Sequence, residues 1–317
     1  MRRAVRLGLA AAAAIAAPLS AQNAKLPPNA PVDPAAASPD TIGLGVEDMR
    51  MTVPVSIGAS GPYRFVIDTG SERTVVSREL AGTLNLAAGR RVRVTTMTGQ
   101  GELATFLLPA LQVSMVKPDT IEAPAVSEAN LGAPGMLGID ALKGHAVSID
   151  FDHNLMEVRP AKKRGAAVGP DDIVIRAKNL YGQLIVTDAS YRGRRISVVI
   201  DTGSPITIGN LAMLKRVRTE RSLGNVGLLS VTGQWLQADY RIIDSLNIAG
   251  IEFNSVPMGF ADALPFKRFG LTNTPALMLG MDTLKLFRRV QIDFANREIR
   301  LTLPKDVRVD PAVRFGY

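Results

Sequence analysis

Residues 65–71 have the sequence FVIDTGS, an apolar run that ends in a carboxylate and a Thr-Gly turn. Residues 198–204 repeat it as VVIDTGS. Each β-branched run indicates a buried strand, and each glycine indicates a tight turn where the backbone passes close to another group. A single aspartate often begins a turn for local reasons. Two copies after buried strands instead predict that Asp68 and Asp201 are brought face to face by a pseudo-twofold axis.

Three more landmarks follow both copies in the same order and at nearly the same spacing. They are TGQ at 98–100 and 232–234, MLGID at 136–140 with MLGMD at 278–282, and IDF at 149–151 and 292–294. Repetition over this length predicts an internal duplication, and two copies are too few for a solenoid. The chain is therefore predicted to form two homologous lobes.

This double set of motifs resembles the aspartic proteases of the pepsin/retropepsin group over roughly residues 50 to 303. The resemblance implies a mostly β fold, in which two homologous retropepsin-like β-barrel lobes enclose an interlobe cleft, as in the pepsin-like acid proteases. It also implies that Asp68 and Asp201 are the catalytic pair of an aspartic endopeptidase. Such an enzyme uses no metal and no other cofactor.

Two carboxylates about 3 Å apart cannot both ionise cheaply, so the pair holds one proton over a range of pH. The ionised member can take a proton from a trapped water while the protonated member donates to the carbonyl oxygen of the scissile peptide. The division of these roles belongs to the coupled pair rather than to either residue. Neither a metal nor a covalent intermediate is needed.

The resemblance assigns supporting roles to eight further residues. The threonines lock the two loops together, the first glycines let the backbone approach the carboxylates, the serines hydrogen-bond an outer carboxylate oxygen, and the last glycines belong to segments that thread beside the loops. These residues are Thr69 and Thr202, Gly70 and Gly203, Ser71 and Ser204, and Gly138 and Gly280. Turn capping would explain an isolated Thr or Ser, but the duplication favours the functional role. Asp140 and Asp282 also repeat, and we interpret them as turn and helix-cap residues.

Each lobe also has a hairpin with a Gly-containing tip, which the resemblance identifies as a flap over the substrate. The predicted flap residues are Thr98, Gly99, Gln100, Thr232, Gly233, Gln234 and Trp235. Neither tip has the tyrosine of pepsin-like flaps, and their symmetry is similar to the retroviral type. Trp235, the only tryptophan, either stacks on substrate or packs under its own hairpin, and the sequence leaves both open.

Glu72 and Pro205 depart from the family pattern, which has a small hydroxyl residue after the motif. A Glu72 carboxylate near the pair would raise its pKa, unless the side chain faces solvent.

Composition and periodicity divide the chain into six segments. They are a signal peptide (1–21), a flexible leader (22–40), an N-terminal protease lobe (41–159), a linker (160–171), a C-terminal protease lobe (172–303) and a C-terminal tail (304–317). Closely spaced strand patterns, with short helices expected at 78–84 and 282–287, favour a mostly β fold. Sequence features do not reveal whether the leader acts as a propeptide.

The predicted signal has a basic start, an apolar run at 7–17 and small residues at 20–21, as in a secretory peptide cleaved before Gln22. An uncleaved anchor is the alternative, although the run is too short to span a bilayer comfortably. No other stretch could cross a membrane. The chain has no cysteine, which excludes disulfides and a lipoprotein anchor and favours a bacterial periplasm. We expect an exported protein, periplasmic or secreted.

Composition also limits the partners. The net charge is +8, and without the three arginines of the predicted signal it is a mild +5 (34 Lys+Arg against 29 Asp+Glu). No aromatic residues interleave with the basic ones as in nucleic-acid binders. His145 and His153 are too few for a zinc site without cysteine. We expect a monomer that binds extended peptide or unfolded protein.

Two other functions fit parts of the pattern. A catalytically weak or inactive protease-like module of the cell envelope would bind peptide without cutting it, although both aspartates are present. A glycosidase would also use paired carboxylates, but usually about 5–9 Å apart.

Overall fold

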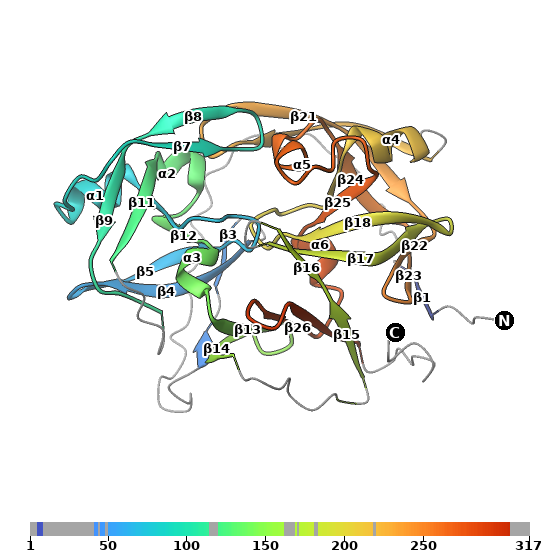
Figure 1. Ribbon diagram of the computed structural model, residues 1–317, viewed down its shortest axis with the longest axis horizontal. Coiled ribbons are helices and arrows are strands. Elements are labelled where there is room, and N and C mark those ends of the chain that lie inside the picture. Colours follow the sequence, from blue (N-terminus) through green and yellow to red (C-terminus); the bar gives the residue numbers. More distant parts are fainter. Residues whose placement is uncertain are drawn as a thin grey trace, which may run out of the picture.

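The computed structural model (Figure 1) describes residues 5–8, 41–43, 45–47, 50–113, 120–161, 169, 171–180, 183–217 and 220–304. The predicted leader and residues 305–317 of the predicted tail lie outside the described residues. Within the predicted signal peptide, only β1 (Val5–Gly8) is described, and it pairs in parallel with β23 (Ile251–Asn254). Within this described part, no helix has the length and apolarity needed to cross a membrane.

The N-terminal lobe is built on an eight-stranded sheet. The strands run in the order β10 (Leu111–Gln112), β4 (Arg50–Ile57), β5 (Ser60–Ile67), β12 (Gly135–Leu137), β6 (Val75–Ser77), β11 (Ile121–Val126) and β9 (Thr105–Leu108), and β3 (Gly45–Glu47) pairs with β4. In the second half of β4, residues 53–57, buried and half-buried residues alternate. The last three residues of β5 are fully buried, and Asp68 follows them directly.

The C-terminal lobe has an eleven-stranded sheet. Its strands run in the order β1, β23, β22 (Leu246–Ile248), β17 (Gln183–Tyr191), β18 (Arg194–Ile200), β25 (Ala276–Leu279), β19 (Ile208–Gly209), β24 (Val256–Phe260), β21 (Trp235–Ile243) and β20 (Ser222–Leu229), and β16 (Lys178–Leu180) pairs with β17. The central order β18-β25-β19-β24 has the same strand directions as β5-β12-β6-β11 of the first lobe. The two-lobed, mostly β fold predicted from the repeated motifs is confirmed.

The two lobes share a third, six-stranded sheet that the sequence did not predict. It runs β15 (Asp172–Arg176), β27 (Glu298–Thr302), β26 (Arg289–Asp293), β13 (His145–Asp150), β14 (Leu155–Pro160) and β2 (Thr41–Gly43), and lies below both lobes in Figure 1. Its centre is the antiparallel pair β13–β26, in which buried Val147 faces buried Ile292. An ion pair between Asp150 and Arg289, with 2.6 Å between their closest atoms, crosses the same boundary.

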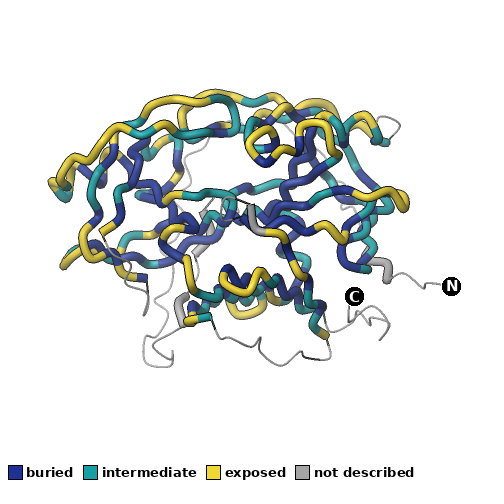
Figure 2. The backbone as a smooth tube through the Cα atoms, in the orientation of Figure 1, coloured by how far each residue is buried: buried dark blue, intermediate teal, exposed yellow. Residues whose placement is uncertain are grey.

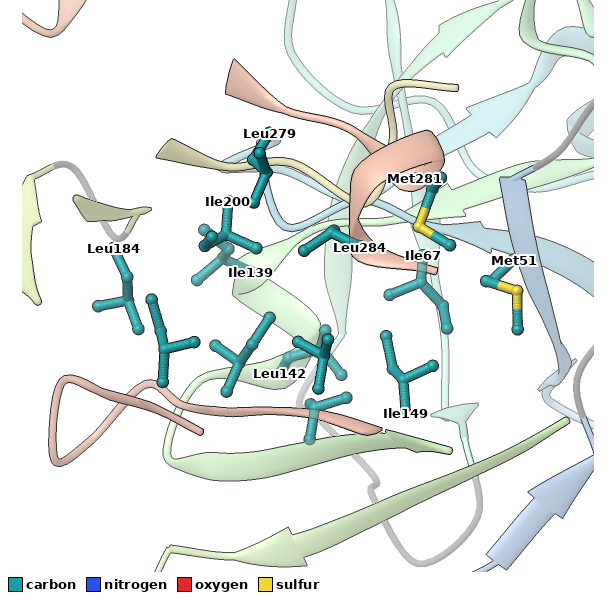
Figure 3. Packing of buried hydrophobic residues seen from close by; sticks show 14 of the residues in the cluster. Met51, Ile67, Ile139, Leu142, Ile149, Leu184, Ile200, Leu279, Met281 and Leu284 are labelled. Atoms are coloured by element: carbon teal, nitrogen blue, oxygen red, sulfur yellow. The ribbon is translucent and has the colours of Figure 1, made fainter. Parts of the chain in front are cut away.

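One apolar core lies between the shared sheet and the loops that carry the two aspartates. Figure 3 shows Ile67 and Ile139 of the first lobe close to Ile200, Leu279 and Met281 of the second, and all five belong to one buried cluster. The strands that deliver the two aspartates are therefore anchored in common packing. Figure 2 shows the contrast with the upper arch of the molecule, where much of the backbone is exposed.

Short helices close the turns around these sheets. They are α1 (Arg78–Thr83), α2 (Glu128–Leu131), α3 (Ile139–Leu142), α4 (Leu211–Val217), α5 (Leu264–Arg268) and α6 (Met281–Leu284). The expected helix at 78–84 is α1. The one expected at 282–287 corresponds to α6, which ends at Leu284. The remaining four helices have too few turns to show helical periodicity in the sequence.

Candidate active site

Asp68 and Asp201 leave their strands at equivalent points of the two lobes. The Asp68 backbone N–H donates to the Leu137 carbonyl at 2.9 Å, and the Asp201 N–H donates to the Leu279 carbonyl at 3.1 Å. These carbonyls belong to β12 and β25, which run in parallel beside β5 and β18. Each aspartate therefore lies at the end of its own strand and is held there by a backbone hydrogen bond to the neighbouring strand.

Glycine is required two residues after each aspartate. The Gly70 N–H donates to Asp68 Oδ1 at 2.8 Å, and the Gly203 N–H donates to Asp201 Oδ1 at 3.0 Å. A Cβ atom on Gly70 would lie 2.7 Å from Asp201 Oδ1, and one on Gly203 would lie 2.2 Å from Asp68 Cγ. Each glycine thus makes room for the carboxyl group of the opposite lobe, as predicted for these two positions.

The two carboxyl groups are half-buried, and each lies against the glycine of the opposite loop, which brings them together. Burial, followed by the charge of Asp201, raises the pKa of Asp68 well above its usual range. Burial also raises the pKa of Asp201, but that rise is opposed by the amides of Gly203 and Ser204 and by the hydrogen bond from Asp68. The arrangement favours a single proton shared by the pair.

Thr69 and Thr202 connect the two loops by a reciprocal set of buried hydrogen bonds. The Thr69 N–H donates to Thr202 Oγ1 at 3.1 Å, and the Thr202 N–H donates to Thr69 Oγ1 at 3.2 Å. Each hydroxyl then donates into the other lobe, Thr69 to the Ile200 carbonyl at 3.0 Å and Thr202 to the Ile67 carbonyl at 2.9 Å. The structure therefore places both threonines where the predicted interlobe lock requires them.

The serines do not have the predicted contact. The Ser71 hydroxyl donates to the Arg73 carbonyl at 2.8 Å, and the Ser204 hydroxyl donates to the Ile206 carbonyl at 2.7 Å. The backbone amides of the two serines, rather than their hydroxyls, bond the carboxyl groups of Asp68 and Asp201. The hydroxyls turn away because a carbonyl two residues ahead offers a local acceptor within the same loop.

Gly138 and Gly280 lie where the threading segments pass closest to the aspartate loops. A Cβ atom on Gly138 would lie 2.3 Å from the Arg73 carbonyl carbon, and one on Gly280 would lie 2.3 Å from the Ile206 oxygen. Any side chain would push the threading segment away, as we expected for these positions.

A threonine in each lobe, which the sequence analysis missed, fastens this contact. Thr74 donates through both its N–H (2.8 Å) and its hydroxyl (2.6 Å) to Asp140 Oδ1, and its hydroxyl oxygen accepts from the Gly138 N–H at 3.2 Å. Thr207 makes the equivalent bonds to Asp282 and Gly280. Asp140 and Asp282 are thus not simple helix caps, because they link the threading segment to the catalytic loop. Their repetition in the sequence was the available signal.

The two predicted flaps meet above the aspartates. The first is the hairpin of β7 (Val92–Thr95) and β8 (Gln100–Leu103), and the second is the hairpin β20–β21. Gln100 and Trp235 are the first residues of β8 and β21, so the turns proper comprise 96–99 and 230–234. Thr98 Oγ1 donates to Gln234 Oε1 at 2.8 Å, which joins one tip to the other. Gly99 and Gly233 lie within the two turns, as does Thr232.

Each flap also reaches over the opposite lobe. Met97 packs against an apolar cluster of the C-terminal lobe that includes Val199, Ile208 and Met278. Val231 packs in the same way against a cluster of the N-terminal lobe. The Met97 carbonyl also accepts a hydrogen bond from the Leu264 N–H of the C-terminal lobe at 3.0 Å. The flap tips therefore cross, while Leu103 of the first flap and Leu228 and Leu236 of the second pack on their own lobes.

A cavity of about 530 Å³ lies beneath the flaps and contains both aspartates. Its walls include Val75, Val126 and Met136 on one side and Val199, Ile208 and Met278 on the other. Gln183 also lines it and donates through its side-chain amide to the Gly70 carbonyl at 2.7 Å. The site is thus a mostly apolar cleft that contains two acids.

Glu72 does not act on the pair as expected. The Arg268 guanidinium donates to the Glu72 carboxylate at 2.6 to 2.8 Å, and this ion pair joins the two lobes at the cleft wall. Burial and the charge of Asp201 are the two causes that raise the pKa of Asp68 most. Because Arg268 supplies a positive charge directly beside Glu72, the extra negative charge is compensated locally.

The chemistry of the cleft does not include a recognisable metal site. Over the described ranges, no group of three or more His, Cys, Asp or Glu side chains is placed to hold a metal ion. His145 contacts the Lys143 carbonyl and His153 contacts Asp150, both on the shared sheet or its turn.

Replacing Thr69 by valine should destabilise the protein although it preserves the shape of the side chain. The Thr202 N–H would lose its acceptor inside a buried interface, which costs about 1–3 kcal/mol. Urea unfolding should show that loss for Thr69→Val and a much smaller one for Thr69→Ser. Thr83→Val, on the exposed face of α1, is the matched control. Equal stability of the valine and serine variants would contradict the assigned lock.

Two family models match the chain, one in each lobe. The model described as gag-polyprotein putative aspartyl protease matches residues 53–144, and the one described as aspartyl protease matches residues 187–283. The first match contains Asp68 and the second contains Asp201. No curated protein matches the chain. With one such domain in each half, the chain belongs to the aspartyl proteases and is a bilobal, retropepsin-like member of that family.

Proposed function

We propose that this protein is an aspartic endopeptidase that hydrolyses peptide bonds with a water molecule activated between Asp68 and Asp201. The observation that carries the proposal is the pair of interacting carboxyl groups, one from each lobe, in the cleft beneath the flaps. Both members of the pair come from one chain, so we further propose that the enzyme acts as a monomer.

The two acids supply opposite halves of the reaction. The ionised carboxylate takes a proton from water as the water oxygen bonds to the carbonyl carbon, and the protonated carboxyl gives its proton to the carbonyl oxygen. In the resulting gem-diol intermediate the C–N bond then breaks, the departing nitrogen takes the proton of the pair, and one hydroxyl of the intermediate returns a proton to the pair as the carboxylic acid product forms. The pair again holds one proton at the end, which is the state that burial and mutual repulsion favour.

The cleft supports an extended peptide as the substrate. Crossed flaps cover the aspartates, and apolar clusters lie on both sides of them. We therefore propose that apolar side chains on either side of the scissile bond pack against these two clusters. Burying each such side chain is worth about 1.5–3 kcal/mol of transfer free energy.

We also propose that the protein is exported. The support is the basic and then apolar start of the sequence, followed by small residues at 20–21. Cell fractionation with mass spectrometry of the amino terminus should find the chain outside the cytoplasm and beginning at Gln22. A cytoplasmic protein that retains Met1 would contradict this.

Replacing either aspartate of the pair by asparagine should remove peptide cleavage. Asparagine keeps the size of the side chain but can neither take the proton from water nor share a proton, so we expect a loss of at least about 10²–10⁴-fold in kcat/KM. This is checked by mass spectrometry of a peptide library after separate incubation with wild type, Asp68→Asn and Asp201→Asn. In size-exclusion chromatography, the wild-type activity should elute at the size of a single chain.

Asp152→Asn is the matched control, because Asp152 is exposed and pairs with Arg288 away from the cleft. It should cleave like the wild type. Peptide binding by wild type without any cleavage would instead indicate a binding module.

The pH profile of activity should be bell-shaped, because the reaction requires one proton on the pair. Its alkaline limb should lie above the ordinary aspartate pKa of 3.8, because the pKa of Asp68 is raised.

The free energy of unfolding should also depend on pH through the same raised pKa. A carboxyl with a raised pKa stabilises the folded state fully below its unfolded pKa and loses that contribution as the pH rises through the folded value, by at most about 1.4 kcal/mol per pH unit.

Asp68→Asn carries no such charge, so its melting temperature relative to wild type should increase between pH 4 and pH 7. Parallel thermal scans of the two proteins test this. A constant difference in melting temperature across that interval would show that the pKa of Asp68 is not raised.

A further inference from the structure

The second flap has two chemically different faces. Leu228 and Leu236, which lie opposite one another, face inward and pack against the apolar cluster of the C-terminal lobe. The next opposed pair, Leu229 and Trp235, faces outward, with 40% and 64% of these residues exposed. Because side chains alternate between the faces of a strand, the hairpin presents an apolar surface on the side away from its own core.

The Trp235 ring is held in place on this outer face. A Cβ atom on Gly227 would lie 3.0 Å from Trp235 Cε3 and 3.3 Å from Cζ3. The ring therefore rests on the bare backbone of the neighbouring strand, in space that any other residue at Gly227 would occupy. The Trp235 ring therefore lies on the outer face of its hairpin and not under it.

This surface continues the cleft that contains the aspartates. Trp235, Leu229 and Gly227 all line the same cavity as Asp68 and Asp201. Singly exposed apolar residues are common on protein surfaces. Here two of them are adjacent, one is a tryptophan, and both open into the cavity.

We propose that Trp235 and Leu229 form an outer subsite of the cleft, which binds an apolar or aromatic side chain of the peptide at a distance from the scissile bond. This inference rests on the proposed peptide-binding function and adds a substrate class to it. Peptides that extend beyond the two central apolar clusters and carry such a side chain bind better than peptides that fill the centre alone.

The chain contains a single tryptophan, so its fluorescence reports this subsite directly. The probe is a series of 14-residue peptides of Ala, Gln and Ser with Leu-Phe at the centre, in which one further Leu replaces Ser at each flanking position in turn. Binding is measured on the full chain carrying Asp68→Asn, by anisotropy of a labelled peptide and by tryptophan emission. We expect the flanking Leu to raise affinity about tenfold at one or two positions, with a blue shift in emission.

In the same background, Trp235→Ser should remove the position-dependent gain, measured as the ratio of affinities for the peptides with and without the flanking Leu. Leu211→Ser is the matched control, because Leu211 is 42% exposed on α4 and does not line the cleft. It should retain the gain.

Three results would overturn the proposal: equal affinity for every peptide of the series, a gain that survives Trp235→Ser, or binding without any change in emission. Because the protein in this test cannot cut, failure of the wild type to hydrolyse peptides would contradict the proposed function and not this subsite.

Discussion

Two acids that must share one proton inside the protein impose most of the structure described above. Neither Asp68 nor Asp201 can be buried alone without a large cost, so each needs the other, and each lobe supplies only half of what is needed. The amides of Gly70 and Gly203 bond the carboxyl groups of their own lobes. The reciprocal bonds of Thr69 and Thr202 then fix the distance between the loops. The strands, threading segments and common core serve to hold these groups in register.

The repeated parts of the site were predictable from the sequence, because each lobe needs the same residues to hold its aspartate. Buried strands, tight turns and threading glycines each have a local sequence signal, and a second copy removes the chance explanation. Thr74 and Thr207 repeat as well, but a buried threonine in a strand region has no distinctive signal until its aspartate partner is seen. That partner is Asp140 for Thr74 and Asp282 for Thr207, 66 and 75 residues away.

Other features could not be predicted, because they depend on choices made in three dimensions. Each serine hydroxyl of the motif donates to a carbonyl of its own loop and not to the aspartate that the family resemblance suggested. Strand β13 pairs with its chain neighbour β14, and β26 pairs with β27, as in ordinary hairpins. The pairing of β13 with β26 joins these two hairpins across the lobes. Glu72 and Arg268 are 196 residues apart, and no local pattern associates them.

Glu72 and Pro205 occupy the same place in the two repeats, yet only one of them carries a charge bridged to the other lobe. In a homodimer a single codon would specify both places, and the binding groove would look identical from either end. Joining the halves in one polypeptide removes that constraint. A bound peptide and the same peptide turned end for end therefore meet different surroundings, so the groove has an intrinsic polarity along which the amino-to-carboxyl direction of a substrate can be distinguished.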